Sequence, residues 1–341
     1  MTDKEIRELR ARWGSSNPVP SDAPVSDQAR EEILRRILTT TRHRRWARFW
    51  PILAGVVAAS VVVPVVAVVL GATGTGKYAA TPPPLRYQSI PDDIPDHERL
   101  LDLALAAERE VTTQSAPGPV EYLKLVSWDL SSRIDGRQVT SAVVPAQREL
   151  WRAPDGSART VVRIQPPQFY SDDQRRAWHD DGSPGANTPP DVTDYPPGSY
   201  PAIWPDRPPT DPVDLTRWLL STRPPGGVMA IVDAANDLLE ERVLTGTERA
   251  ALIRVLAQQP GIRYEGETVD RGGRPGYGFS VESADSGLPT RYTFIISARG
   301  RFLAYEQMLT ETAGRLNVPV PSVISYTVYL TAAHVDAIPS A

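Results

Sequence analysis

Cysteine is absent from the 341-residue chain. The protein can therefore form no disulfide bond, and it cannot hold zinc through a His-x₃-Cys-x₂-Cys set of ligands. Histidine is scarce as well. His97, His179 and His334 lie far apart, and none has a metal ligand three or four residues further along the chain. We therefore expect no metal site.

Recognisable catalytic motifs are also missing. The chain has no G-x-S-x-G and no H-E-x-x-H pattern, which would indicate a serine hydrolase or a zinc protease. Carboxylates are abundant, but no spacing singles out a pair for acid–base chemistry. We expect a protein that is not an enzyme and that needs no cofactor.

Charge is absent from one long stretch. Ile52–Gly71 comprises 20 residues without a charged side chain, which is the length of an apolar helix that crosses a bilayer. We predict a transmembrane helix over residues 49–72, in which Pro64 is tolerated because other groups satisfy the freed backbone carbonyl. Three aromatic residues are expected to anchor this helix at the membrane boundary: Trp46, Phe49 and Trp50.

The end of this stretch, Gly71–Lys77, also fits GxxxxGK, the pattern of a phosphate-binding loop. However, Tyr78 stands where the Ser or Thr that binds Mg²⁺ belongs. Such a loop must also open a helix, and the run Pro82–Pro84 prevents one. We interpret these glycines as the exit from the membrane helix.

Positive charge predicts the orientation of the membrane helix. Six arginines lie within 20 residues before it, against Lys77 and Arg86 within the same distance after it. Because cytoplasmic flanks carry such an excess, we predict a single-pass protein of the cell membrane with a cytoplasmic N-terminus and an extracytoplasmic C-terminal domain. A cleaved signal peptide would begin its apolar region earlier, and a twin-arginine signal fits the spacing poorly. The six are Arg35, Arg36, Arg42, Arg44, Arg45 and Arg48.

Net charge differs between the two sides. Residues 1–50 hold 11 Lys/Arg and 7 Asp/Glu, which leaves 26 of the 37 basic and 34 of the 41 acidic residues for the remainder. An acidic outer domain argues against nucleic acid as its partner. The basic cytoplasmic region, residues 1–48, predicts two short amphipathic helices over 3–13 and 26–40, which either dock into a partner's groove or lie on lipid head groups.

Residues 73–95 are predicted to be a Gly/Pro-rich linker, and residues 96–341 one extracytoplasmic domain. Their order of helix, strands, helices and strands is typical of an α+β fold with one antiparallel sheet and helices on one face. A proline-rich loop is expected at about 166–210. The expected helices cover 96–111, 211–220, 228–241 and a segment capped by Thr245 that ends before Pro260. The expected strands cover 121–130, 147–153, 158–165, 263–269, 276–283, 291–298, 301–309 and 323–330.

Four motifs stand out within this domain: the hairpin Glu149–Ser157, the helix start Pro209–Pro212, the segment Ala250–Ala257 that ends at Pro260-Gly261, and the turn Asp270–Gly276. Together with the basic stub and the span, they resemble an uncharacterised actinobacterial family of single-pass membrane proteins. Members are commonly encoded beside extracytoplasmic-function sigma factors, and the resemblance implies no catalytic residues. The element order is also similar to that of periplasmic sensor and lipoprotein-carrier folds, which implies a curved half-barrel sheet here.

Two functions remain open on these grounds. In the first, the outer domain senses an envelope condition and residues 1–45 hold or release a sigma factor, as an anti-sigma-like regulator would. In the second, the curved sheet binds a lipid or a lipoprotein. Aromatic side chains on its strands would line that site, although they would equally fill an ordinary core. The candidate lining residues are Tyr122, Trp128, Tyr326 and Tyr329. We favour the first function.

Overall fold

A computed structural model describes residues 79–88, 94–110, 118–135, 138–169, 171–180, 189–223, 226–316 and 318–340, all within one compact unit. The predicted cytoplasmic region and the predicted membrane helix lie outside these residues. So do the anchor residues Trp46, Phe49, Trp50 and Pro64 and the arginines at 42, 44, 45 and 48. Within the described ranges, no helix combines the length and the apolar character that a bilayer crossing requires.

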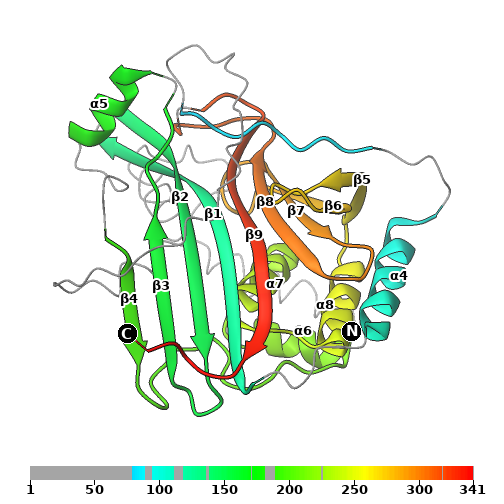
Figure 1. Ribbon diagram of the computed structural model, residues 1–341. Coiled ribbons are helices and arrows are strands. Elements are labelled where there is room, and N and C mark those ends of the chain that lie inside the picture. The colour runs from blue at the N-terminus through cyan, green and yellow to red at the C-terminus, as the bar shows by residue number, and fades with distance from the viewer. Residues whose placement is uncertain are drawn as a thin grey trace, which may run out of the picture. The chain divides into compact units, whose positions relative to one another are not determined.

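One nine-stranded sheet organises the fold, in the order β4-β3-β2-β1-β9-β8-β7-β6-β5 (Figure 1). Every neighbouring pair of strands is antiparallel, so the predicted α+β class with an antiparallel sheet is confirmed. The strands are β1 (Val120–Asp135), β2 (Gln138–Arg152), β3 (Ala158–Ile164), β4 (Asp191–Tyr195), β5 (Arg263–Val269), β6 (Pro275–Ser283), β7 (Thr290–Ile296), β8 (Phe302–Leu309) and β9 (Ser322–Val335).

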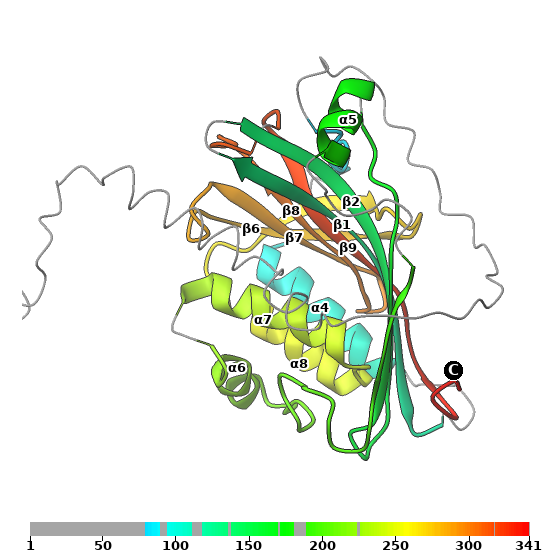
Figure 2. The same ribbon diagram turned by 90° about the vertical axis from the view of Figure 1, so that its left-hand side faces the viewer.

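Helices gather on one face of this sheet. Figure 2 shows the sheet bending around α7 and α8, with α4 beside α8 and α6 on their outer side. A further helix, α5, lies apart from this group and contacts β2. The helices are α4 (Asp96–Arg109), α5 (Asp172–Asp180), α6 (Pro212–Leu220), α7 (Gly227–Glu241) and α8 (Gly246–Ala257).

The main core lies between the helices and the sheet. The apolar stripe of α7 is mostly buried there, as are Leu252 of α8 and Phe294 of β7. Burying each such side chain contributes about 1.5–3 kcal/mol. One polar contact crosses this core, because the Tyr329 hydroxyl donates to Oδ1 of Asn236 at 2.7 Å. The face of the sheet that carries Tyr329 is called the helix face below, and the opposite face the outer face.

Local sequence signals predicted several boundaries correctly. The capping box predicted at Thr245 is present: its hydroxyl accepts from the Glu248 N–H, and Glu248 accepts from the Thr245 N–H at 2.8 Å. The turn between β2 and β3 is closed by Ala153 N–H donating to the Ser157 carbonyl at 2.9 Å. Both helix start and hairpin are therefore confirmed.

Other boundaries differ from the predictions. β1, β2 and β9 are longer than expected. In β2 the strand continues through Pro145 and through polar residues, which weaken the strand pattern of its sequence. The proline-rich stretch at 166–210 is not only a loop. It holds α5, and it holds β4, which pairs with β3 and forms one edge of the sheet. Pairing with β3 outweighs the poor strand pattern of the exposed, acidic sequence Asp191–Tyr195.

Residues 79–88, which the sequence assigned to the linker, lie along the outer face and are called the strap below. Figure 1 shows the strap in light blue near the upper ends of β8 and β9. Ala79 and Thr81 are buried. At the other end, Gln88 pairs with Glu267 of the edge strand β5. The domain thus includes residues immediately after those predicted to leave the membrane.

Candidate functional site

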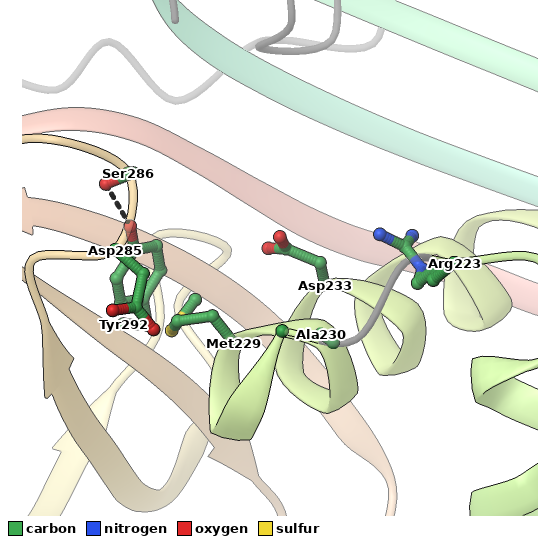
Figure 3. Close-up of a pocket in the computed structure, with 8 residues that line it drawn as sticks. Arg223, Met229, Ala230, Asp233, Asp285, Ser286 and Tyr292 are labelled. Carbon is green, nitrogen blue, oxygen red and sulfur yellow. Dashed lines mark hydrogen bonds between the residues drawn. The ribbon is translucent and has the colours of Figure 1, made fainter. Parts of the chain in front are cut away.

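A cavity of about 230 Å³ opens where the start of α7 meets the turn between β6 and β7 (Figure 3). Its volume lies below the roughly 300–1,000 Å³ of typical small-molecule sites, so it suits a small solute. The walls combine apolar, acidic and basic groups. They are formed by Arg223, Gly226, Met229, Ala230, Asp233, Asp285, Ser286 and Tyr292.

The start of α7 leaves hydrogen-bond donors at this cavity. Gly226 occupies the N-cap without a side-chain cap, and the first turn of α7 carries no acidic residue. The first N–H groups of a helix have no partner within the helix itself. Arg223 adds a buried Nε that has no hydrogen-bond partner, although its guanidinium also pairs with Asp237. This side of the cavity favours an acceptor.

Carboxylates face the cavity from two different elements. Figure 3 shows Asp233 pointing out from α7 between Arg223 and the β6–β7 turn, which carries Asp285. In the same turn region, the Tyr292 hydroxyl and Ser286 Oγ lie 2.8 Å apart. Burial raises the pKa of Tyr292, and the charge of Asp233 adds to this increase. The cavity therefore offers donors on one side and acceptors on the other.

The turn that forms one wall of this cavity also packs against an apolar cluster that includes the first residue of the strap. Leu288 follows Asp285 and Ser286 in the turn, and it packs against the cluster formed by Ala79, Leu309 and Val318.

An ion pair is buried on the outer face beside the strap. Arg271 donates to Glu306 Oε2 at 2.5 Å, and both side chains are less than a tenth exposed. Arg271 also donates to the Pro83 carbonyl of the strap at 2.8 Å, and its guanidinium lies 4.6 Å from the centre of the Tyr326 ring. Burial raises the pKa of Glu306, while Arg271 opposes the increase.

A second polar cluster, centred on Glu121, is structural. Its carboxylate accepts from Arg207 at 2.6 Å, from Arg242 at 3.1 Å and from the Val243 N–H at 3.2 Å. Arg207 also pairs with Glu248 of α8, and Arg242 donates to the carbonyls of residues 204–206. These contacts tie the proline-rich stretch to β1 and to the helices.

The four aromatic residues suggested as a lipid-binding lining are divided between the two faces of the sheet. Trp128 stacks on Tyr326 with ring centres 4.2 Å apart, and Arg271 places this pair on the outer face. Tyr122 lies on the same face as Trp128, six residues away on β1, and stacks on Trp151. Tyr329 lies on the helix face. These residues therefore cannot line one shared cavity.

Sequence reasoning did not identify the cavity. Its residues come from the segment before α7, from α7 and from β6–β7, and no spacing joins them. One local signal was available: Gly226-Gly227 precedes a strongly apolar helix and supplies no N-cap side chain. A helix that begins in this way leaves its first backbone N–H groups without side-chain acceptors. It does not indicate which other segment forms the opposite wall of the cavity.

The described side chains include no group of three or more His, Asp or Glu residues placed to hold a metal ion. His179 instead lies near the Phe169 ring, with ring centres 6.5 Å apart. Comparison with models of known protein families finds no match, and comparison with curated proteins finds none either. The resemblance to the actinobacterial family therefore stays a prediction.

Proposed function

We propose that this protein is a single-pass envelope sensor, with an extracytoplasmic α+β domain that regulates a sigma factor bound to its cytoplasmic N-terminal region. The proposal joins the predicted topology to one contact in the domain. Leu288, in the turn that forms a wall of the cavity, packs against the cluster that contains Ala79. Ala79 follows the predicted membrane exit by only a few residues.

This packing supports sensing because it joins a candidate ligand site to the tether, which is the stretch of chain between the predicted membrane helix and the domain. A ligand can shift a conformational equilibrium only by binding one state better than another. A solute in the cavity would contact the β6–β7 turn, and Leu288 of this turn packs against the cluster to which Ala79 of the strap belongs. Occupancy could then change how the tether sits on the domain.

A lipid-binding module was the other function that the sequence suggested. The residues proposed to line its site lie on both faces of the sheet, and on the helix face Tyr329 packs within the main core. We therefore favour the sensor. Native mass spectrometry of the protein from bacterial membranes tests this choice: a stoichiometric bound lipid that survives mild activation would favour the lipid-binding module.

Retention of a sigma factor is the direct test of the regulator. The full-length protein, purified in detergent, should bind an extracytoplasmic-function sigma factor of its own organism with micromolar or tighter affinity. Replacing Ile33, Leu34 and Ile37 by Ser should abolish this binding, because these residues lie on the apolar face of a predicted helix. A matched control replaces Ser15 and Ser16 by Ala. No binding by the unmodified protein would refute the proposal.

The membrane topology can be tested by labelling single introduced cysteines, because the chain has no cysteine of its own that would react. Ser15→Cys places a single thiol before the predicted span. Ser199→Cys places a single thiol after it, at an exposed position. In intact cells, a reagent that cannot cross the inner membrane should label only Ser199→Cys. Equal labelling of both variants would refute the predicted orientation.

A further inference from the structure

The strap is held to the sheet at both ends. At its start, Ser322 Oγ donates to Thr81 Oγ1 at 2.8 Å, in a buried contact. At its end, Gln88 N–H donates to the Glu267 carbonyl at 2.8 Å, and Glu267 N–H donates back at 3.0 Å. Thr268 Oγ1 donates to the Arg86 carbonyl at 2.8 Å. These bonds give the strap a defined path across the outer face.

Between its ends the strap rests on side chains of the sheet. Leu85 packs against Ile295, Leu303 and Ala304. Tyr87 lies over Gly278, where an added Cβ atom would stand 2.5 Å from the Tyr87 ring. The absence of a side chain at position 278 therefore makes room for the strap.

The sheet does not depend on the strap for its own pairing. All nine strands are hydrogen-bonded to one another without it, and only Gln88 pairs with β5. Each strap contact contributes modestly by itself. Pro82–Pro84 favour an extended chain whether the strap is bound or free, which lowers the entropy that binding costs. Loss of the strap would therefore remove none of the hydrogen-bonded pairs among the nine strands.

We propose that the strap is a releasable latch that gives the tether two lengths, an inference that rests on the membrane anchoring in the proposed function. When the strap is bound, the domain is held by the few residues that precede Ala79. When it is released, its ten residues add a reach of up to about 33–36 Å. Release also exposes the Arg271–Glu306 pair, which lies beside the strap.

Hydrogen exchange of the full-length protein in lipid nanodiscs tests whether the latch opens. The Gln88 amide should exchange at least tenfold faster than the slowest amides of β7 and β8, because local opening needs less free energy than global unfolding. Exchange of Gln88 at the same rate as those strand amides would overturn the proposal, since the strap would then be a permanent part of the fold.

Two variants should weaken the latch from opposite sides. Gly278→Val places a side chain against the Tyr87 ring, and Tyr87→Ala removes that ring. Each should raise the Gln88 exchange rate at least tenfold and leave the β8 amides unchanged. Tyr87→Ala keeps the test valid if Gly278→Val fails to fold. An unchanged Gln88 rate in Tyr87→Ala would count against the latch.

A cross-link should close the latch. The chain has no cysteine, so Thr81→Cys with Ser322→Cys introduces a single possible bridge, formed by oxidation or by a short bifunctional thiol reagent. Bridging should slow Gln88 exchange at least tenfold relative to the reduced double variant, which is the matched control. Equal rates in the bridged and reduced forms would overturn the proposal.

Tether length can be measured on the same proteins. A donor dye at Val213→Cys, which is exposed on α6, reports energy transfer to acceptor lipids in the nanodisc. Tyr87→Ala should reduce the energy transfer relative to the same labelled protein with Tyr87 intact. Equal transfer in these two proteins would refute the proposal that the tether has two lengths. If cross-linking changes Gln88 exchange but leaves sigma-factor binding unaltered, the latch stands and the proposed regulator fails.

Discussion

The two faces of the sheet are built differently. On the helix face, large apolar side chains of α7, α8 and the strands form one continuous core. On the outer face, small apolar clusters and an ion pair lie beside a strap that pairs with the sheet through a single residue. The comparison teaches that the helix face holds the larger apolar core, so we expect it to contribute more to the stability of the domain than the contacts of the strap.

The largest expected loss follows from a buried charge left without its partner. Glu121→Ala would leave Arg242 buried and unpaired, since Arg242 is 7% exposed. We expect the free energy of unfolding to fall by about 3–5 kcal/mol, as measured by urea denaturation. Glu311→Ala, at an exposed position, is the control and should change stability by less than about 0.5 kcal/mol.

The comparison itself is tested by the same substitution on both faces. Leu252→Ala, in α8, should cost about 2–5 kcal/mol because Leu252 is fully buried. Leu85→Ala, on the strap, should cost about 1 kcal/mol, because Leu85 is only partly buried. Leu105→Ala, 42% exposed on α4, should be close to neutral. Equal losses at positions 252 and 85 would break the distinction between the faces.

A smaller effect is expected at the start of α8. Thr245→Ala removes the acceptor for the Glu248 N–H and should cost about 0.5–2 kcal/mol. Thr222→Ala, which is also at an exposed position and lies outside the cap, serves as the control. Thermal unfolding of both variants measures the difference. Identical melting temperatures would show that the cap contributes nothing to the helix face.

The smallest effect concerns pH and the outer face. Burial raises the folded-state pKa of Glu306 above its unfolded value. The native state then holds this proton more tightly, so its contribution to stability is present at low pH and is lost as pH rises through the raised pKa. Glu306→Gln should flatten this decline in denaturation midpoints measured from pH 4.5 upward. A decline of the same size in the variant would assign it to another group.

Much of the C-terminal meander was readable from the sequence. β5 begins and ends at the predicted residues, and the predicted turn at Asp270 connects it to β6. Turn residues and the alternation of apolar and polar residues are local signals, so they predict strands and turns without knowledge of the fold. The long partner strands β1 and β9 were underestimated, because pairing along their whole length supports residues whose own strand preference is weak.

The candidate site was not readable in this way. Asp233 and Asp285 lie 52 residues apart in sequence, and only the packing of α7 beside the β6–β7 turn places both at one cavity. The strap was likewise predicted as a free linker. Its prolines indicated an extended chain correctly, but no local pattern indicated that the outer face would bind it.

The sequence by itself determined the α+β class, the helix cap, the hairpin turns and the apolar stripe of α7, since each depends on residues close together in the chain. It also predicts the membrane span from one uncharged run. Tertiary structure alone decided which aromatic residues face the helices, which carboxylates share a cavity and where the strap lies. Such contacts join distant segments, and their free energy exists only once the chain has brought them together.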